Sequence, residues 1–223
     1  MRRMPLKDRT LPNYTWGEEC LNTLSHGLGA LFGVVVLVLC IVVAHQNGNT
    51  RGIIGGAIYG GSMIILYSVS ATYHGLKKGI AKQVLRIIDH CSIYFLIAGT
   101  YTPILIGQIF DYNASIAILL LIVEWGGCIG GVICSAIDVH RFRYLSMFFY
   151  LAMGWSLIVV IRPVLKIFPL PFFLWVLAGG IAYTVGAVLY GFGKKIRYFH
   201  GAFHLFVLAG SALQFVGILL YAL

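Results

Sequence analysis

The chain has 223 residues, of which 60% are hydrophobic and only 10% are charged, and its mean hydropathy is +0.91. A soluble globule of this size cannot bury so much apolar surface, so the composition predicts an integral membrane protein. The formal net charge is +9, but the basic residues are scattered among short connections and no nucleic-acid-binding motif accompanies them. We therefore expect no nucleic-acid partner and interpret these charges as signals of membrane orientation.

The first 26 residues are predicted to be a basic segment on the cytoplasmic side. Its first part carries four basic residues interrupted by prolines, and no apolar core with a small-residue cleavage site follows at once. This pattern does not fit a removable signal peptide. The basic residues are Arg2, Arg3, Lys7 and Arg9.

Seven apolar segments follow, each near the roughly 20 residues that a helix needs to cross a bilayer. They cover residues 27–45, 52–74, 87–107, 114–135, 144–162, 171–191 and 203–222. The predicted fold is an all-α integral membrane protein, a bundle of seven transmembrane helices. No connection is long enough for a second domain, so residues 1–223 are expected to form one membrane domain.

The basic residues are distributed unevenly between the two sides of these spans. Counted on alternate sides, thirteen Lys and Arg fall on the side of the amino terminus and three on the other. This asymmetry predicts a cytoplasmic amino terminus and an outer carboxyl terminus. Aromatic residues near the predicted span ends, Tyr14 and Trp16 among them, are interpreted as anchors at the membrane interface.

Pairs of glycines at helical spacing give two spans a face of small residues. Such faces allow close approach of helices, and we expect them to pack within the bundle. Association of two chains into a homodimer through the same faces is the alternative. The pairs are Gly55-Gly56, Gly60-Gly61, Gly126-Gly127 and Gly130-Gly131.

Three histidines lie at the ends of apolar spans where the orientation places them in one leaflet. His74 ends the second predicted span, and His200 and His204, four residues apart, precede and open the seventh. Residues at this spacing share a helix face, so the pair can aim at one point that His74 reaches from another helix. Three protein ligands and one open position are typical of catalytic zinc, and the pattern predicts a Zn²⁺ site. The alternative for the pair alone is an interfacial position.

Two further polar residues are predicted near the same depth. Asp89 is placed at the start of the third span, where its carboxylate could accept a proton, although pairing with Arg86 or capping of the helix are alternatives. Ser70 lies one turn from His74 and could bond the attacking water or the developing oxyanion, or instead a carbonyl of its own helix. Activated water beside a general base predicts a hydrolase whose substrate is a membrane lipid with an amide or ester bond.

Several motifs occur together in an order that resembles a known family. They are Glu18 to Gly27, the Ser70-x-x-x-His74 step, Asp89-His90-Cys91-Ser92-Ile93-Tyr94 leading to Thr102-Pro103, and His200-x-x-x-His204. Together they resemble the bacterial hemolysin III proteins, the prokaryotic branch of the progestin and adipoQ receptor family. The resemblance covers nearly the whole chain.

The resemblance implies a seven-helix bundle in the bacterial inner membrane with an intramembrane zinc near the cytoplasmic face. By position, His74, His200 and His204 match the metal ligands of the family. Asp89 matches a carboxylate linked to the metal through water, and Ser70 matches a nearby serine. Relatives are linked to hydrolysis of ceramide-like lipid amides, which implies a ceramidase-like activity.

The same resemblance leaves other functions open. The name hemolysin implies a pore-forming, lytic protein, which these spans disfavour because their polar residues gather mainly at one end. A receptor or sensor with structural zinc stays open, since bound metal stabilises a bundle equally well. Asn22 and His26 match a family signature whose chemistry does not follow from the residues. Gln214 stands where many bacterial relatives have a histidine, and its role stays open.

Overall fold

The structure is a computed structural model that describes residues 10–193 and 196–223. Within these ranges seven helical stretches are long and apolar enough to cross a membrane, and no strand occurs. The elements are α1 (Trp16–Gln46), α2 (Thr50–Gly75), α3 (Ile80–Ile104), η2 (Leu105–Ile109), α4 (Phe110–Tyr112), α5 (Ala114–Asp138), α6 (Arg143–Gly154), η3 (Ser156–Val160), α7 (Ile161–Ile167), α8 (Leu170–Phe192) and α9 (Phe199–Tyr221).

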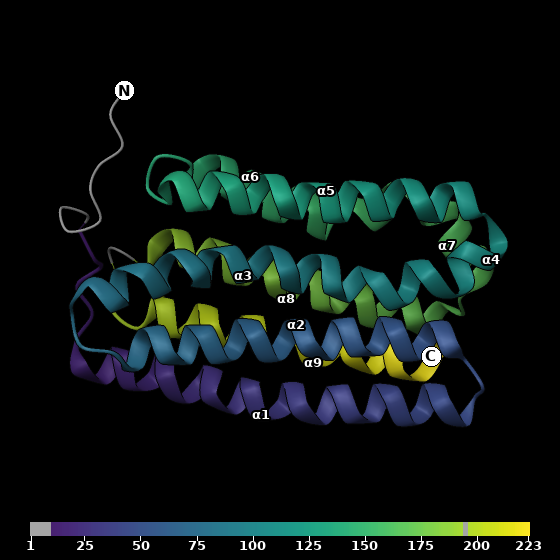
Figure 1. Cartoon of the computed structure of the whole chain (residues 1–223), viewed down its shortest axis with the longest axis horizontal. Helices are drawn as coiled ribbons and strands as arrows, with labels where there is room; N and C mark the ends of the chain where they lie inside the picture. Colours follow the sequence, from purple (N-terminus) through teal and green to yellow (C-terminus); the bar gives the residue numbers. More distant parts are fainter. Residues whose placement is uncertain (1–9, 194–195) are drawn as a thin grey trace.

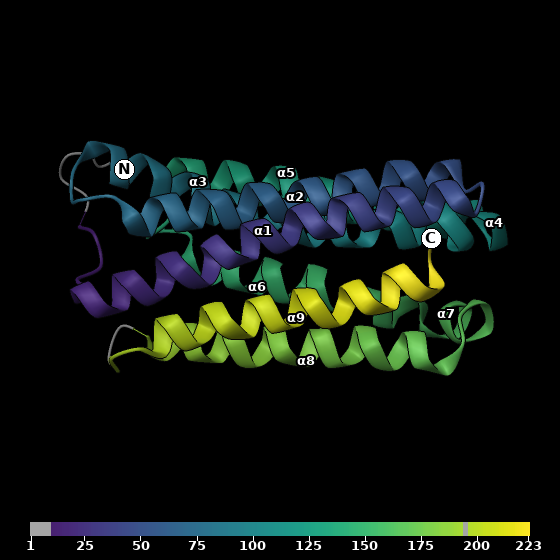
Figure 2. The same ribbon diagram turned by 90° about the horizontal axis from the view of Figure 1, so that it is seen from below.

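The helices run along one common direction and form a bundle of two layers (Figure 1). Figure 2 shows α1, α2, α3 and α5 on one side and α6, α8 and α9 on the other. The described chain begins near one end of the bundle and finishes at the opposite end, as an odd number of spans requires. Many Leu, Ile and Val side chains stay exposed on the outward faces, where a bilayer would cover them. The prediction of an all-helical protein with seven spans is confirmed.

α1 begins well before the span predicted at residue 27, because its start is capped. The Thr15 hydroxyl accepts a hydrogen bond from the Glu18 backbone N–H at 3.3 Å, and the Glu18 carboxylate accepts from the Thr15 backbone N–H at 2.8 Å. This reciprocal capping box satisfies two backbone donors that a helix start would otherwise leave free. The second half of the predicted basic segment is therefore helical, whereas residues 1–9 lie outside the described residues.

The sequence predicts that Asp89 lies at the start of its helix, and this prediction is wrong. α3 starts at Ile80, after Gly79, and so continues for more than two turns before Asp89. The apolar pattern missed this start because the first turns carry polar residues. Capping of the helix by Asp89, one of the alternatives, is therefore wrong.

The fifth predicted span is a broken helix rather than a continuous one. α6 ends at Gly154, and a short 3₁₀ stretch, η3, separates it from α7. The Tyr101 hydroxyl satisfies backbone groups at this break, donating to the Gly154 carbonyl at 2.9 Å and accepting from the Leu157 N–H at 3.3 Å. Beside it, buried Glu124 accepts a hydrogen bond from the Ser156 hydroxyl at 2.6 Å. Broken backbone inside a membrane protein needs such internal partners because lipid offers none.

The glycine-rich faces of α2 and α5 have different neighbours. A Cβ at Gly55, Gly56 or Gly60 would approach atoms of a neighbouring helix to 2.5–2.6 Å, so these glycines allow α2 to pack against α1 and α3. A Cβ at Gly131 would come within 2.2 Å of the Tyr94 ring, while the face of Gly126 has no such neighbour within 4 Å. Packing within the bundle is thus evident on α2, and association of two chains stays a prediction.

Candidate metal centre

Three imidazoles meet at the end of the bundle where α2 finishes and α9 begins. One ligand atom from each of His74, His200 and His204 lies within 4.8 Å of the other two, and all three residues are buried. The Nε2 atoms of His200 and His204 are 3.1 Å apart, and those of His200 and His74 are 3.4 Å apart. His74 on α2 and the two histidines on α9 thus direct their Nε2 atoms at one point.

These contacts cannot all be hydrogen bonds within the protein. An imidazole nitrogen carries either one proton or one lone pair, so Nε2 of His200 can complete only one of its two close contacts. A cation among the three nitrogens would accept every lone pair at once. Tetrahedral zinc, with Zn–N distances of about 2.0–2.1 Å, would separate its ligand nitrogens by about 3.3 Å, close to the observed spacing. The donor set therefore fits zinc.

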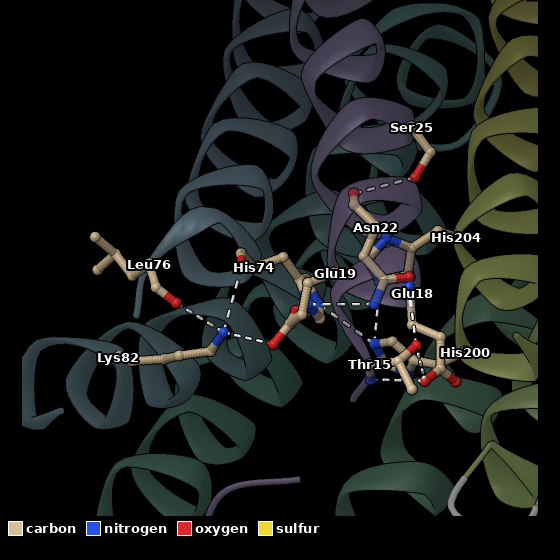
Figure 3. A network of polar contacts seen from close by, with 10 residues as sticks. All are labelled: Thr15, Glu18, Glu19, Asn22, Ser25, His74, Leu76, Lys82, His200 and His204. Carbon is tan, nitrogen blue, oxygen red and sulfur yellow. Dashed lines mark hydrogen bonds and ion pairs between the residues drawn. The ribbon is translucent and has the colours of Figure 1, made fainter. Parts of the chain in front are cut away.

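A partly buried ion pair holds the Nδ1 side of the His74 ring (Figure 3). The Glu19 carboxylate lies 2.6 Å from Nδ1 of His74 and accepts a hydrogen bond at 2.6 Å from the Lys82 ammonium. Lys82 is only 4% exposed and also donates to the His74 and Leu76 carbonyls. Since the carboxylate favours a proton on Nδ1, Nε2 keeps its lone pair for the cluster. Ligand histidines commonly have such an outer partner.

Glu19 and Lys82 were not identified from the sequence as site residues. Glu19 belongs to the signature stretch in α1, and its partner follows the turn between α2 and α3. The signal that could have found Glu19 is the Thr15-x-x-Glu18 capping box, which places this stretch on a helix. The role of Lys82 depends on how the turn folds.

Asn22 and His26 also lie against the cluster, on the same helix. The Asn22 amide is 3.3 Å from Nδ1 of His74, and the His26 ring stacks on that of His204 with centroids 3.7 Å apart. Both residues are buried. The family signature in α1 therefore packs directly around the three histidines.

Tyr14 is a further residue whose place at the site the sequence did not reveal. Its ring stacks on His200 with centroids 4.9 Å apart, and it lies 5.8 Å from the ring of His74. Burial raises the pKa of the Tyr14 hydroxyl above its ordinary value, so the group stays neutral. Its interpretation as a membrane anchor is wrong, because the ring covers the histidines instead of facing outward.

The start of α9 is held by α1. Tyr198 adopts a left-handed conformation with φ of 64°, and its backbone N–H donates to the Glu18 carboxylate at 2.9 Å. This turn sets the direction in which α9 leaves the preceding connection. The position of His200, two residues later, is thus tied to the beginning of α1.

The two other predicted residues lie beside the histidines. Ser70 is buried on α2, one turn before His74, and its hydroxyl interacts with the Asp89 carboxyl of α3. Asp89 is half-buried, and its electrostatic partners are His74 first and Arg86 second. Within its described residues the structure shows no hydrogen bond from Ser70 to a carbonyl of its own helix, and the hydroxyl lies beside the Asp89 carboxyl instead. The structure thus brings all five predicted site residues together.

A cavity of about 150 Å³ extends from this cluster into the bundle. Ser70, Asp89, His200 and His204 line it at one end, whereas His74 lies behind them. Farther in, its wall is largely apolar and comes mainly from α3, α6, α8 and α9. The residues there include Leu96, Ile97, Leu151, Trp155, Gly180 and Val207. A polar end and an apolar body are the features of a site for an amphiphilic ligand.

The fold and the cluster define a multi-span membrane protein whose buried histidines face an internal cavity. The family model described as haemolysin-III related matches residues 14–215, so the chain belongs to the hemolysin III family. The family expected from the sequence motifs is thereby confirmed. The match includes α1 from its capped start and ends within α9, so it contains every residue of the cluster.

Individual relatives agree with this assignment. The chain is 38% identical over 187 residues to a hemolysin-3 homolog of Bacillus subtilis, covering 84% of this chain and 86% of the relative. It is 37% identical over 173 residues to hemolysin-3 of Bacillus cereus, covering 78% of each. The human monocyte to macrophage differentiation factor is 29% identical over 206 residues, covering 89% of this chain and 81% of that protein.

Proposed function

We propose that this protein is a zinc-dependent hydrolase that cleaves an amide or ester bond of a membrane lipid. The observation that carries the proposal is the convergence of three histidine nitrogens beside a carboxyl group at the polar end of an apolar cavity. The residues that would hold the ion are His74, His200 and His204. Zinc bound there would supply Lewis acidity and a water that is nucleophilic near neutral pH.

The protein's own groups have separate tasks in this proposal. Asp89 lines the cavity next to the histidines, so its carboxylate can accept the proton of the attacking water and return it to the leaving group. Ser70 lies beside Asp89 and would restrict the rotation of its carboxyl group. Glu19 holds the His74 ring so that Nε2 points to the cluster. Each of these groups is supported by a neighbour, as an efficient site requires.

The substrate class follows from the shape and lining of the cavity. A ligand that enters must place apolar surface along the inner wall while its polar group meets Asp89 and the histidines. A lipid with a long chain next to an amide or ester bond has this arrangement, and it is already dissolved in the membrane. A ceramide-like amide is the first substrate to test.

We also propose that the end of the bundle carrying the cluster faces the cytoplasm, in the inner membrane of a bacterium. The support is the excess of Lys and Arg on that side of the spans. Cysteine accessibility on either side of inverted and right-side-out vesicles would test the orientation. Labelling of a cysteine introduced at exposed Lys78 from the outside of intact cells would refute it.

The decisive experiment combines metal analysis with hydrolysis of N-acyl lipids by the purified protein. We expect about one zinc per chain, and loss of zinc when the three histidines are changed to alanine. His45→Ala is the matched control, because His45 is exposed at the other end of α1. Asp89→Asn should keep the fold and the zinc but lose turnover. Wild-type hydrolysis by Asp89→Asn would refute the task given to this carboxyl, and a metal-free active protein would refute the proposal.

Lysis is the alternative, and it is favoured by the name hemolysin-3 of the Bacillus cereus relative. The test is release of a dye from liposomes that contain only this protein. Release that persists in the triple histidine variant would favour a pore and count against the hydrolase. No release by a protein that hydrolyses lipid would exclude the alternative.

A further inference from the structure

One polar side chain in the cavity has no protein partner. Gln214 lines the cavity and is only 8% exposed. Within the described part of the chain its side chain forms no hydrogen bond. A carboxamide carries two N–H donors and a carbonyl acceptor, so these groups are available to a ligand in the cavity.

The polar neighbours of Gln214 in the cavity wall are already paired. The Tyr183 hydroxyl bonds Ser211 at 2.7 Å. The Thr184 hydroxyl donates to the Gly180 carbonyl and accepts from the Trp155 indole N–H. Gln214 is therefore the group in this part of the wall with hydrogen-bonding capacity left for a ligand.

The fold makes a specific place for this side chain. α8 and α9 lie side by side (Figure 2), and Gly179 on α8 faces Gln214 on α9. A Cβ at Gly179 would lie 2.4 Å from Cγ of Gln214, so any larger residue would displace the carboxamide. The glycine thus gives the side chain room to reach the cavity.

The distance from the histidines limits what the partner can be. Gln214 follows His204 by ten residues on one helix, which corresponds to about 15 Å along the axis. A ligand whose polar head meets Asp89 must therefore present a second polar group well along its chain. That group must be neutral, because an ion at this depth would lack a compensating charge.

We propose that Gln214 is a specificity residue that recognises a hydroxyl group in the middle part of a long acyl chain. A hydroxyl both donates and accepts, which matches the two kinds of group on the carboxamide. The inference rests on the proposed function, because it assigns the acyl chain of the lipid to the cavity. It specifies that the acyl chain of the substrate carries a hydroxyl group.

Binding of free fatty acids tests the inference without any turnover. Oleate and ricinoleate differ only in a hydroxyl about two-thirds of the way along the chain, and oleate hydroxylated next to the carboxylate is the positional control. Dissociation constants would be measured by displacement of a fluorescent fatty acid from the full-length protein in nanodiscs. We expect ricinoleate to bind about tenfold more tightly than oleate. The positional control should gain little.

Variants then connect the preference to the carboxamide. Gln214→Met keeps the length of the side chain but removes its hydrogen bonds, so ricinoleate and oleate should bind equally. Gly179→Ala should reduce the preference by displacing Gln214, whereas Gly191→Ala, on the same helix with no neighbour within 4 Å, should preserve it. If Gly179→Ala fails to fold, Gln214→Met decides the question.

The possible failures are distinguishable. Equal binding of oleate and ricinoleate by the wild-type protein overturns the inference but leaves the hydrolase proposal intact. A preference for ricinoleate that survives Gln214→Met also overturns it. Binding of neither fatty acid overturns the inference together with the assignment of the cavity to acyl chains, while loss of hydrolysis in Asp89→Asn would still support the metal centre.

Discussion

Glu19→Gln should weaken metal binding through the tautomer of His74. In the wild-type protein one carboxylate oxygen faces the Lys82 ammonium and the other faces Nδ1 of His74, each at 2.6 Å. An amide has only one oxygen, and the ammonium has no acceptor, so the oxygen must face Lys82. The amide NH₂ then faces Nδ1, which must accept, and the proton moves to Nε2. That nitrogen must lose this proton before it can bind a metal, which lowers the affinity.

The expected loss is tenfold to a hundredfold in zinc affinity, about 1.4–2.7 kcal/mol, which is the usual effect of removing an outer partner of a ligand histidine. The double variant Glu19→Gln with Lys82→Met provides the sharper test. Without the ammonium the amide can turn its oxygen toward Nδ1–H, so part of the affinity should return. Competition with a chromophoric chelator would measure both constants in purified protein.

The reasoning would be refuted if Glu19→Gln bound zinc like the wild-type protein. It would also be refuted if the double variant were no better than the single one, because the amide orientation would then not be the cause. Thermal unfolding of both variants serves as the control for a general loss of structure.

Three further outcomes are expected. Gly131→Ala should destabilise the protein by about 1–3 kcal/mol, because its Cβ would lie 2.2 Å from the Tyr94 ring. The control Gly126→Ala has no neighbour within 4 Å and should leave the stability unchanged. Equal melting temperatures of the two variants would contradict this packing. Glu124→Gln should leave thermal stability nearly unchanged, whereas Glu124→Lys should lower expression strongly, since an unpaired charge is costly at a site with 0% exposure. Tyr14→Ala should speed removal of zinc by a chelator, and Tyr14→Phe should not, because the ring rather than the hydroxyl covers the histidines; equal rates for both would argue against this cover.

The helices and the predicted metal ligands followed from local patterns. A run of about 20 apolar residues predicts a span wherever it occurs, because a bilayer requires it. His200 and His204 share a face through their spacing alone, and the direction of the spans put His74 at the same end. These arguments need no knowledge of how the helices pack. Orientation and metal identity remain predictions.

The surroundings of the histidines could not be predicted in the same way. Tyr14 reaches His200 only because the segment before α1 folds back over the bundle, and Lys82 reaches Glu19 only through the turn after α2. Both depend on the path of short polar connections, which carry no periodic signal. The break after Gly154 also lacks a local signal, since its backbone partner is Tyr101 on another helix.

The order of the cluster along the chain has a consequence for biosynthesis. His74 emerges from the ribosome early, whereas α9, which supplies the other two imidazoles, is made after the other described helices. A nascent chain therefore offers no complete ligand set until α9 has entered the membrane. Metal uptake is expected to follow the insertion of α9, and chains that lack this helix should stay metal-free from the beginning.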